Sequence, residues 1–331
     1  MAGTIIFTGA NSSLGIPAVE HILQNYPQHN AILTVRDASH ADENTKSLRN
    51  VIARYPKANI SVHELDLASL SATRVFADSV ASGVQCGSYP SVVAIICNAY
   101  YWNLVGDPEL TDDGYDKTFQ VSHISHAALV LRLLRNCEKE CRIILLSSDS
   151  HWPGKNQMER YAPTISDLDV LVNPPVDQDK QGRGYQRYAT AKLAITTWMY
   201  PLNECLRKDP KLSNVTAVAI NPGNLVDSRA LRSNTPTSMA RMQTFVYKPL
   251  LPLLRILMGP TLRTAAPAAV DVVELALNPA YKGQRGFYTL LEKDQSSPES
   301  RNREKQKRLW DKTLEWAKIS KEDTVLFTAF D

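Results

Sequence analysis

Short apolar runs alternate with segments of helical period, and this alternation constrains the fold more than any other feature. The runs are Thr4–Thr8, Ala31–Val35, Val92–Cys97, Ile143–Leu146 and Val215–Ile220, with Ile60–Val62 a weaker one. Near-continuous Val, Ile and Leu runs are typical of strands buried on both faces of a parallel sheet. Helices are predicted between them, over residues 15–26, 41–54, 70–83, 115–136 and 185–208. The repetition predicts an α/β fold, a doubly wound parallel sheet of Rossmann type with right-handed crossovers.

The pattern loosens after Ile220 into a segment rich in proline, methionine and leucine. Further elements are then predicted: a helix near 264–278, an apolar run at 286–290 and an amphipathic helix near 308–318. No linker divides the chain, so we expect a single domain with an extended C-terminal substrate lid and helix. Its expected parts are a cofactor half (about 1–150), a catalytic and lid half (about 151–290) and a charged tail with a helix (291–331).

The charge balance and the cysteine count limit which binding partners and cofactors the chain is expected to have. Among 331 residues, 37 basic and 34 acidic side chains give a net charge of +3, too balanced for a protein whose main partner is nucleic acid. Five cysteines are an odd number in a chain with an ample core, so reduced thiols are expected. Cys137 and Cys141 lack a nearby His or Cys pair, and no metal site is expected.

The start of the chain predicts a strand rather than a targeting segment. Met1–Thr4 leads directly into Ile5–Phe7, without a basic leader or a cleavage site. No run of about 18 apolar residues predicts a spanning helix, and cytoplasmic residence is expected. Residues 249–258 come closest to such a run, so contact of residues 245–258 with a membrane surface stays open, as does a homo-oligomer.

A loop of small residues, Thr8–Gly15, joins the first predicted strand to the first helix. Small residues at this turn let backbone N–H groups approach a pyrophosphate, whose charge the helix dipole favours. The candidate cofactor-binding residues are Gly9, Asn11, Ser12, Ser13, Leu14 and Gly15. The alternative is an ordinary tight turn.

Arg36 follows the second strand, where NAD's 2′-hydroxyl is normally held by a carboxylate and a 2′-phosphate by an arginine. We therefore expect NADP(H), although Arg36 as a solvated surface charge is the alternative.

Tyr188 and Lys192 lie four positions apart, hence on one helix face. A neighbouring positive charge lowers the pKa of a phenol from its usual value of about 10, which allows Tyr188 to act as a general acid or base. A chance pair on an exposed helix is the alternative. Upstream, the strand Ile143–Leu146 runs into Ser147 and Ser148.

These motifs, in this order, resemble the short-chain dehydrogenase/reductase family over most of residues 4–290. The resemblance implies that Ser148 bonds the substrate oxygen and that Tyr188 transfers the proton. Lys192 would lower the pKa of Tyr188 and hold the nicotinamide ribose, and Ser147 would be structural. Further implied cofactor contacts are Arg36 for NADP, Asp66 and Leu67 along the adenine, Asn98 and Ala99 with Tyr100 in place of glycine, and Pro222, Gly223 and Leu225 at the nicotinamide.

Three further positions depart from the family pattern. Ser13 replaces the middle glycine of the loop, and Asp227 or Ser228 must stand in for a threonine. Ser122 replaces the asparagine that positions the lysine and a relay water, so Ser122 is kept as a catalytic candidate. His123 and His126 are expected to be packing residues. The departures motivate an alternative function, a nucleotide-binding scaffold with a non-redox isomerase, cyclase or regulatory role.

Forty positions separate Ser148 from Tyr188, more than in compact members of the family. Long loops are usually lids or binding loops, and retinol-dehydrogenase-like members carry a comparable insertion. A second lid is predicted at residues 229–262, whose flexible methionines and aromatics suit a bulky apolar ligand. Packing on the domain or on a second subunit is the alternative. The expected activity is NADP(H)-dependent interconversion of a ketone and a secondary alcohol on a bulky hydrophobic substrate of terpenoid, steroid, retinoid or polyketide type.

Overall fold

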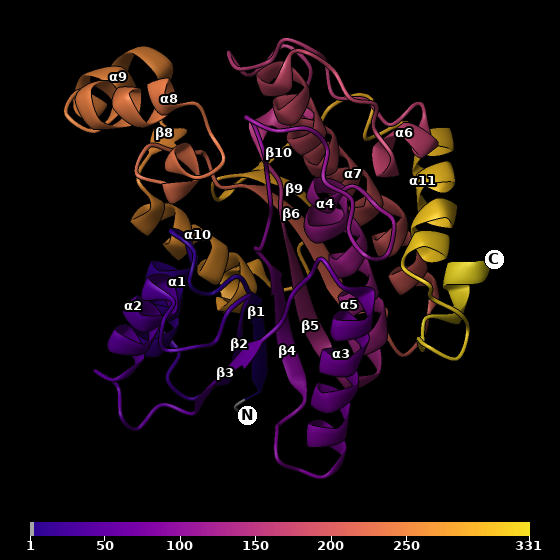
Figure 1. The fold of residues 1–331 in the computed structure, drawn as a ribbon. Helices are drawn as coiled ribbons and strands as arrows, with labels where there is room; N and C mark the ends of the chain where they lie inside the picture. The colour runs from indigo at the N-terminus through magenta and orange to yellow at the C-terminus, as the bar shows by residue number, and fades with distance from the viewer. Residues whose placement is uncertain (1–2) are drawn as a thin grey trace.

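A computed structural model describes residues 3–331, and an eight-stranded sheet forms its centre (Figure 1). The strands, in spatial order, are β10 (Glu292–Asp294), β9 (Gly286–Thr289), β6 (Thr216–Asn221), β5 (Cys137–Leu146), β4 (Val92–Cys97), β1 (Thr4–Thr8), β2 (Asn30–Val35) and β3 (Ile60–Glu64). Neighbouring strands are parallel except β10, which pairs antiparallel with β9. The predicted α/β fold with a doubly wound sheet is confirmed.

Helices cover both faces of this sheet (Figure 1). One face carries α1 (Gly15–Asn25), α2 (Glu43–Ile52) and α10 (Ala265–Leu277). The other carries α3 (Leu70–Gln85), α5 (Ser125–Leu133) and α7 (Lys180–Lys208), with α11 (Arg303–Trp316) packed outside α7. Shorter helices are α4 (Lys117–Phe119), α6 (Leu168–Val172), α8 (Thr237–Met242) and α9 (Leu251–Met258). Strands β7 (Asn224–Leu225) and β8 (Leu262–Arg263) pair at the base of the α8–α9 segment.

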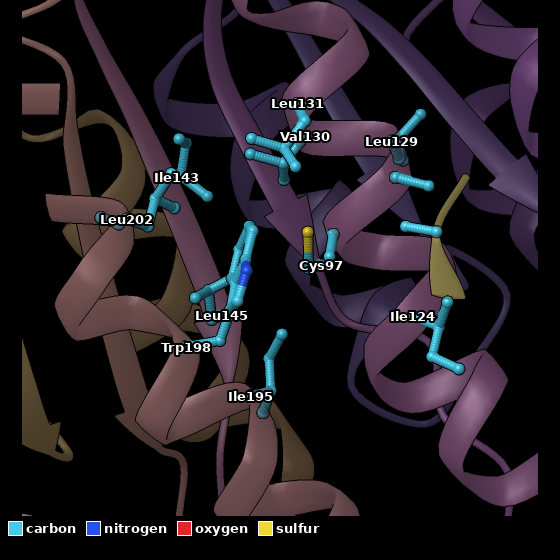
Figure 2. Close-up of a cluster of buried hydrophobic side chains, with 14 of the residues drawn as sticks. Cys97, Ile124, Leu129, Val130, Leu131, Ile143, Leu145, Ile195, Trp198 and Leu202 are labelled. Carbon is cyan, nitrogen blue, oxygen red and sulfur yellow. The ribbon is translucent and has the colours of Figure 1, made fainter. Parts of the chain in front are cut away.

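The core between α7 and the sheet follows the two periodicities of its elements. Figure 2 shows Ile195, Trp198 and Leu202 of α7 beside Ile143 and Leu145 of β5. Spacings of three and four put the α7 residues on one helix face, and a spacing of two puts the β5 residues on one sheet face. Trp198 is fully buried, and a side chain of this size stabilises a core by about 3–5 kcal/mol relative to alanine.

Several element boundaries differ from the predictions for local reasons. A π-helical turn, Gln120–Ile124, interrupts the helix predicted over 115–136. Helix α7 begins at Lys180 rather than 185, because the Asp179 carboxylate accepts a hydrogen bond from the Gly182 N–H and caps it. The last helix begins at Arg303 rather than 308, capped by Asn302. Strand β5 starts at Cys137, six residues before the predicted run. Its first residues are charged and largely exposed, so the apolar pattern did not include them.

The cysteines at positions 86, 97, 137, 141 and 205 are all free thiols, as predicted. Among the helices of residues 3–331, none combines the length and apolar character needed to cross a bilayer.

Candidate active site

The loop between β1 and α1 needs its two glycines. Gly9 has a φ of +66°, and a Cβ there would lie 3.1 Å from Asn98 and from the backbone of Ala99. A Cβ on Gly15 would lie only 2.5 Å from the Ala10 carbonyl oxygen. The absence of a side chain at these two positions therefore lets the loop turn tightly at the carboxyl end of β1. A tight turn at this place is what binding of a pyrophosphate by backbone N–H groups requires.

Asn98 braces this loop from the end of β4. Its Nδ2 donates to the carbonyl oxygens of Thr8 and Gly9, at 2.9 and 3.0 Å, and to Ser12 Oγ at 3.1 Å. The backbone N–H groups of Asn98 and Ala99 in turn donate to Thr8 Oγ1, at 2.9 and 3.1 Å. Two turns that the sequence singled out separately are thus one hydrogen-bonded unit.

The serines of the loop have different partners. Ser12 Oγ accepts from the Gly15 N–H at 2.9 Å, so it closes the first turn of α1. Ser13 Oγ accepts from the backbone N–H of Arg229 at 2.9 Å. The Arg229 guanidinium donates to the Asn11 carbonyl oxygen and lies half-buried. Arg229 is a site residue that sequence reasoning missed, because no motif spacing connects it to a loop more than 200 positions earlier.

The remaining cofactor candidates lie at successive strand ends. Arg36 is exposed after β2 and takes part in no ion pair of the described residues. Asp66 is exposed after β3, whereas Leu67 is buried and its carbonyl accepts from Ser125 Oγ at 2.6 Å. These positions leave the Arg36 and Asp66 side chains open to a ligand.

The Pro222–Gly223 turn follows β6. Gly223 has a φ of +87°, and a Cβ there would lie 2.4 Å from the Thr261 carbonyl oxygen, so glycine is required. The Pro222 carbonyl accepts from Arg263 Nε at 2.9 Å, and Leu225 forms β7 beyond the turn. The Asp227 carboxylate is engaged by the Ala265 N–H at 2.8 Å, which leaves Ser228 as the hydroxyl near the site.

Ser148, Tyr188 and Lys192 come together where β5 ends against α7. Burial, followed by the proximity of Tyr100, raises the pKa of Tyr188 well above its usual value, and a hydrogen bond with Ser148 opposes that rise. Ser148 Oγ also lies 3.1 Å from Asp149 Oδ1, to which it donates. Tyr188 is therefore a neutral phenol at ordinary pH, facing a serine hydroxyl.

Lys192 is buried, and its Nζ donates to the Leu146 carbonyl oxygen at 2.7 Å. Burial lowers the pKa of this ammonium to about 7. Its Nζ lies 5.8 Å from the Tyr188 ring centroid and is directed to the end of β5. Burial is the largest cause of the raised pKa of Tyr188, and the role of Lys192 in setting that pKa stays a prediction.

An apolar cluster surrounds the Tyr188 ring. The rings of Trp102 and Tyr185 lie 5.3 and 6.1 Å from it, centroid to centroid. The other side chains of the cluster are aliphatic and include Met158, Leu104, Ala230, Leu231 and Met239. The segment predicted as a second lid is therefore divided: Ala230, Leu231 and Met239 pack beside Tyr188, whereas Met242 and Phe245 are exposed at 43% and 73%.

Ser122 lies in the π-helical turn and is buried, and its hydroxyl has no hydrogen-bond partner among residues 3–331. His126 Nε2 lies 2.9 Å from Thr8 Oγ1, and His123 Nε2 lies 2.9 Å from Thr313 Oγ1. Burial lowers the pKa of both imidazoles to about 3, so both are neutral packing groups.

In the interval between Ser148 and Tyr188, His151 accepts a hydrogen bond from the Ser297 N–H at 3.0 Å through Nε2. Its Nδ1 lies 2.6 Å from the Ser148 carbonyl oxygen. The C-terminal segment thus supports the backbone of Ser148 through His151.

Comparison with known proteins places the chain in a family. It is 31% identical to the short-chain dehydrogenase iccH of Talaromyces variabilis over 98% of both chains. The chain belongs to the short-chain dehydrogenase/reductase family, and it is an oxidoreductase. Within that family, residues 229–326 match the AcuH dehydrogenase domain. Dehydrogenase acuH of Aspergillus aculeatus is 47% identical over 93 residues, 28% of this chain and 94% of that protein.

Solved structures share the fold. The L-sorbose reductase from Gluconobacter frateurii, complexed with NADPH and L-sorbose, matches with a TM-score of 0.59 at 17% identity, over 89% of this chain and 98% of that one. An NADPH-bound carbonyl reductase from chicken fatty liver matches with a TM-score of 0.56 at 17% identity, over 89% and 99%. The resemblance inferred from the motifs is confirmed, and the non-redox alternative finds no support among these relatives.

Proposed function

We propose that the protein is an NADP(H)-dependent reductase or dehydrogenase that interconverts a ketone and a secondary alcohol on a bulky hydrophobic substrate. The observation that carries the proposal is the grouping of Ser148, Tyr188 and Lys192 beside the glycine loop. The cofactor, when bound, supplies or accepts the hydride, so the protein's task is orientation and proton transfer.

Each polar group has a role in this proposal. The Ser148 hydroxyl donates to the substrate oxygen, and the Tyr188 phenol gives that oxygen its proton in the reducing direction. A pKa raised by burial keeps Tyr188 protonated, which favours its use as an acid. Lys192 would hold the nicotinamide ribose. In the oxidising direction the phenol must first lose its proton, so oxidation is expected to need higher pH.

Ser122 is proposed as the site of a relay water. Its buried hydroxyl lacks a partner, and a buried polar group without one is unusual. A water there would continue a proton path away from Lys192.

The cofactor residues fit the group they are proposed to hold. A Cβ at Gly9 would press against Asn98 and Ala99, and one at Gly15 would press against the Ala10 carbonyl, so both glycines are needed for the tight loop that is proposed to hold the pyrophosphate. The other proposed contacts are Asp66, Leu67, Asn98, Ala99, Pro222, Gly223 and Leu225. Arg36 would bind the 2′-phosphate, and Arg229, which already reaches the Asn11 carbonyl, would meet the pyrophosphate.

The substrate class follows from the walls around Tyr188. Trp102, Tyr185 and the partly buried Leu231 and Met239 make the surroundings of the phenol apolar. Such walls favour a large hydrophobic carbonyl compound over a sugar. The fungal relatives iccH and acuH are named dehydrogenases without a stated substrate.

The test replaces Tyr188 by Phe. Loss of the proton donor should reduce turnover by at least about a hundredfold, while fluorescence titration shows NADPH binding largely intact. Tyr200→Phe is the matched control, because Tyr200 lies on the same helix with its hydroxyl bonded to Ser296 at 2.6 Å. Equal turnover in wild type and Tyr188→Phe would overturn the proposal.

A further inference from the structure

Exposed apolar side chains gather in one segment. We define the apolar arm as residues 237–258, which comprise α8, a π-helical turn (Gln243–Tyr247) and α9. Fifteen large hydrophobic side chains are exposed in the described residues, and eight belong to this arm: Met242, Phe245, Val246, Leu250, Leu253, Ile256, Leu257 and Met258. Soluble proteins rarely expose apolar side chains so densely without a partner.

These side chains do not serve the catalytic site. Among the described residues of the arm, only Met239 packs with the cluster around Tyr188, and most of the large side chains from residue 242 onward are exposed. Figure 1 shows α8 and α9 standing off the α/β body, to which β7 and β8 join them. Phe245, Ile256 and Leu257 are exposed at 73%, 81% and 72%, so most of each side chain faces solvent.

The charge of this region has one sign. Residues 228–270 contain six cations and no Asp or Glu. Arg241, Lys248 and Arg255 are exposed, and none takes part in an ion pair within residues 3–331. The arm is thus both apolar and cationic.

Helix α9 separates these two properties. Leu250, Leu253 and Leu257 recur at helical spacing and share one exposed face with Ile256. Arg255 lies on the opposite side of the helix. An exposed apolar stripe with basic residues on the polar side is the pattern of a helix that lies in a membrane interface.

We propose that the apolar arm docks on an anionic lipid surface. Its leucines and Phe245 would enter the headgroup boundary, and its unpaired cations would attract the negative headgroups. A second copy of the chain fits less well, because two such arms would oppose cations with no carboxylate between them. The proposal is independent of the redox reaction, and its test measures no turnover.

The experiment is co-sedimentation of the full chain with two kinds of vesicle, phosphatidylcholine alone and phosphatidylcholine with phosphatidylserine in equal parts. We expect tighter binding to the anionic vesicles, weakened by salt. Combined Arg241→Gln, Lys248→Gln and Arg255→Gln should lower that binding about ten- to hundredfold. Combined Phe245→Ser, Ile256→Ser and Leu257→Ser should lower it at least about a hundredfold.

Two matched controls keep the composition changes but move them off the arm. Val75, Val176 and Phe327 are exposed at 60%, 70% and 61%, and their combined replacement by Ser should leave binding unchanged. Neutralising Lys57, Lys211 and Arg301, exposed cations that form no ion pair with the described part of the chain, should have little effect. Circular dichroism and thermal melts verify folding.

Failure to bind anionic vesicles would overturn the proposal, as would binding that neither arm variant weakens. A concentration-dependent dimer that the triple Ser variant dissolves, without lipid binding, would assign the arm to self-association instead.

Discussion

The rings of Tyr100 and Tyr188 lie 5.7 Å apart, centroid to centroid, with their planes inclined by 56°. Tyr100 occupies a position where the family usually has glycine, and its ring also lies 5.2 Å from Lys192 Nζ. The phenol proposed to transfer the proton therefore has the ring of Tyr100 as an aromatic wall.

Replacing Tyr100 by Gly should remove this wall. We expect KM for a bulky ketone to rise about three- to tenfold, since an aromatic pair is worth about 0.5–1.5 kcal/mol beyond its buried area. A small ketone should be affected less. Tyr100→Phe keeps the ring and should resemble wild type. Equal losses for the Gly and Phe variants would assign the effect to the hydroxyl and contradict the wall.

Arg36→Ala tests the choice of cofactor. Losing a charged contact to the 2′-phosphate should reduce the NADP-to-NAD ratio of kcat/KM about ten- to hundredfold. Lys57→Ala, another exposed cation, is the control. Steady-state kinetics with both cofactors measures the ratio, and an unchanged ratio would make Arg36 a surface charge only.

Arg229→Met should behave differently from Arg36→Ala. Because Arg229 reaches the loop at Asn11, its loss should raise KM for NADP and NAD alike, by about tenfold, and leave their ratio unchanged. A selective effect on NADP would place Arg229 at the 2′-phosphate instead.

Stability should fall between pH 6.5 and pH 5. Burial lowers the pKa of His123 and His126 to about 3 and that of His151 to about 4. Below pH 6.5 the unfolded chain therefore binds protons that the folded chain does not. For each imidazole, the free energy of unfolding then falls by about 1.4 kcal/mol per pH unit. Burial raises the pKa of the Asp116 carboxyl to about 6, so below pH 6 the folded chain binds one proton that the unfolded chain does not. This proton offsets the loss from one imidazole.

Denaturant unfolding at pH 7 and pH 5 measures this loss. His151→Gln should reduce the slope, because one of the depressed imidazoles is removed. A free energy of unfolding that is flat across this window would contradict the assignment of neutral, buried histidines.

Ser122→Asn restores the amide that the family carries at this position. If Ser122 holds a weakened relay, turnover should be held or raised, while thermal melting reports whether the larger side chain is accommodated. A strong loss of turnover in a folded variant would contradict a weakened relay. It would show that this site works with serine and does not accept the family's asparagine.

Much of this architecture could be predicted because buried strands are near-continuous apolar runs. The run Val92–Cys97 coincides with β4, and Thr4–Thr8 with β1. The first half of β5 is charged and exposed, so it contains no apolar run from which a strand could be predicted. The starts of the helices at Lys180 and Arg303 are set by single capping side chains, Asp179 and Asn302, and the spacing of apolar residues does not indicate these positions.

The candidate site divides in the same way. Residues placed at strand ends, such as Ser148 and Asn98, could be predicted from local order. Arg229 could not, because its contact with Asn11 depends on how the segment after β7 returns to the loop. The direction of the Lys192 ammonium, toward the Leu146 carbonyl, likewise depends on the depth of burial rather than on spacing.

Strand β10 affects how molecules of this protein meet in a crowded solution. Its residues Glu292, Lys293 and Asp294 are all exposed, and they form the outermost row of the sheet beside β9. An incoming strand at that edge would find only three residues to pair with, each carrying a charge. Growth of the sheet from one molecule into the next is disfavoured there, which protects the folded protein from aggregation by strand addition.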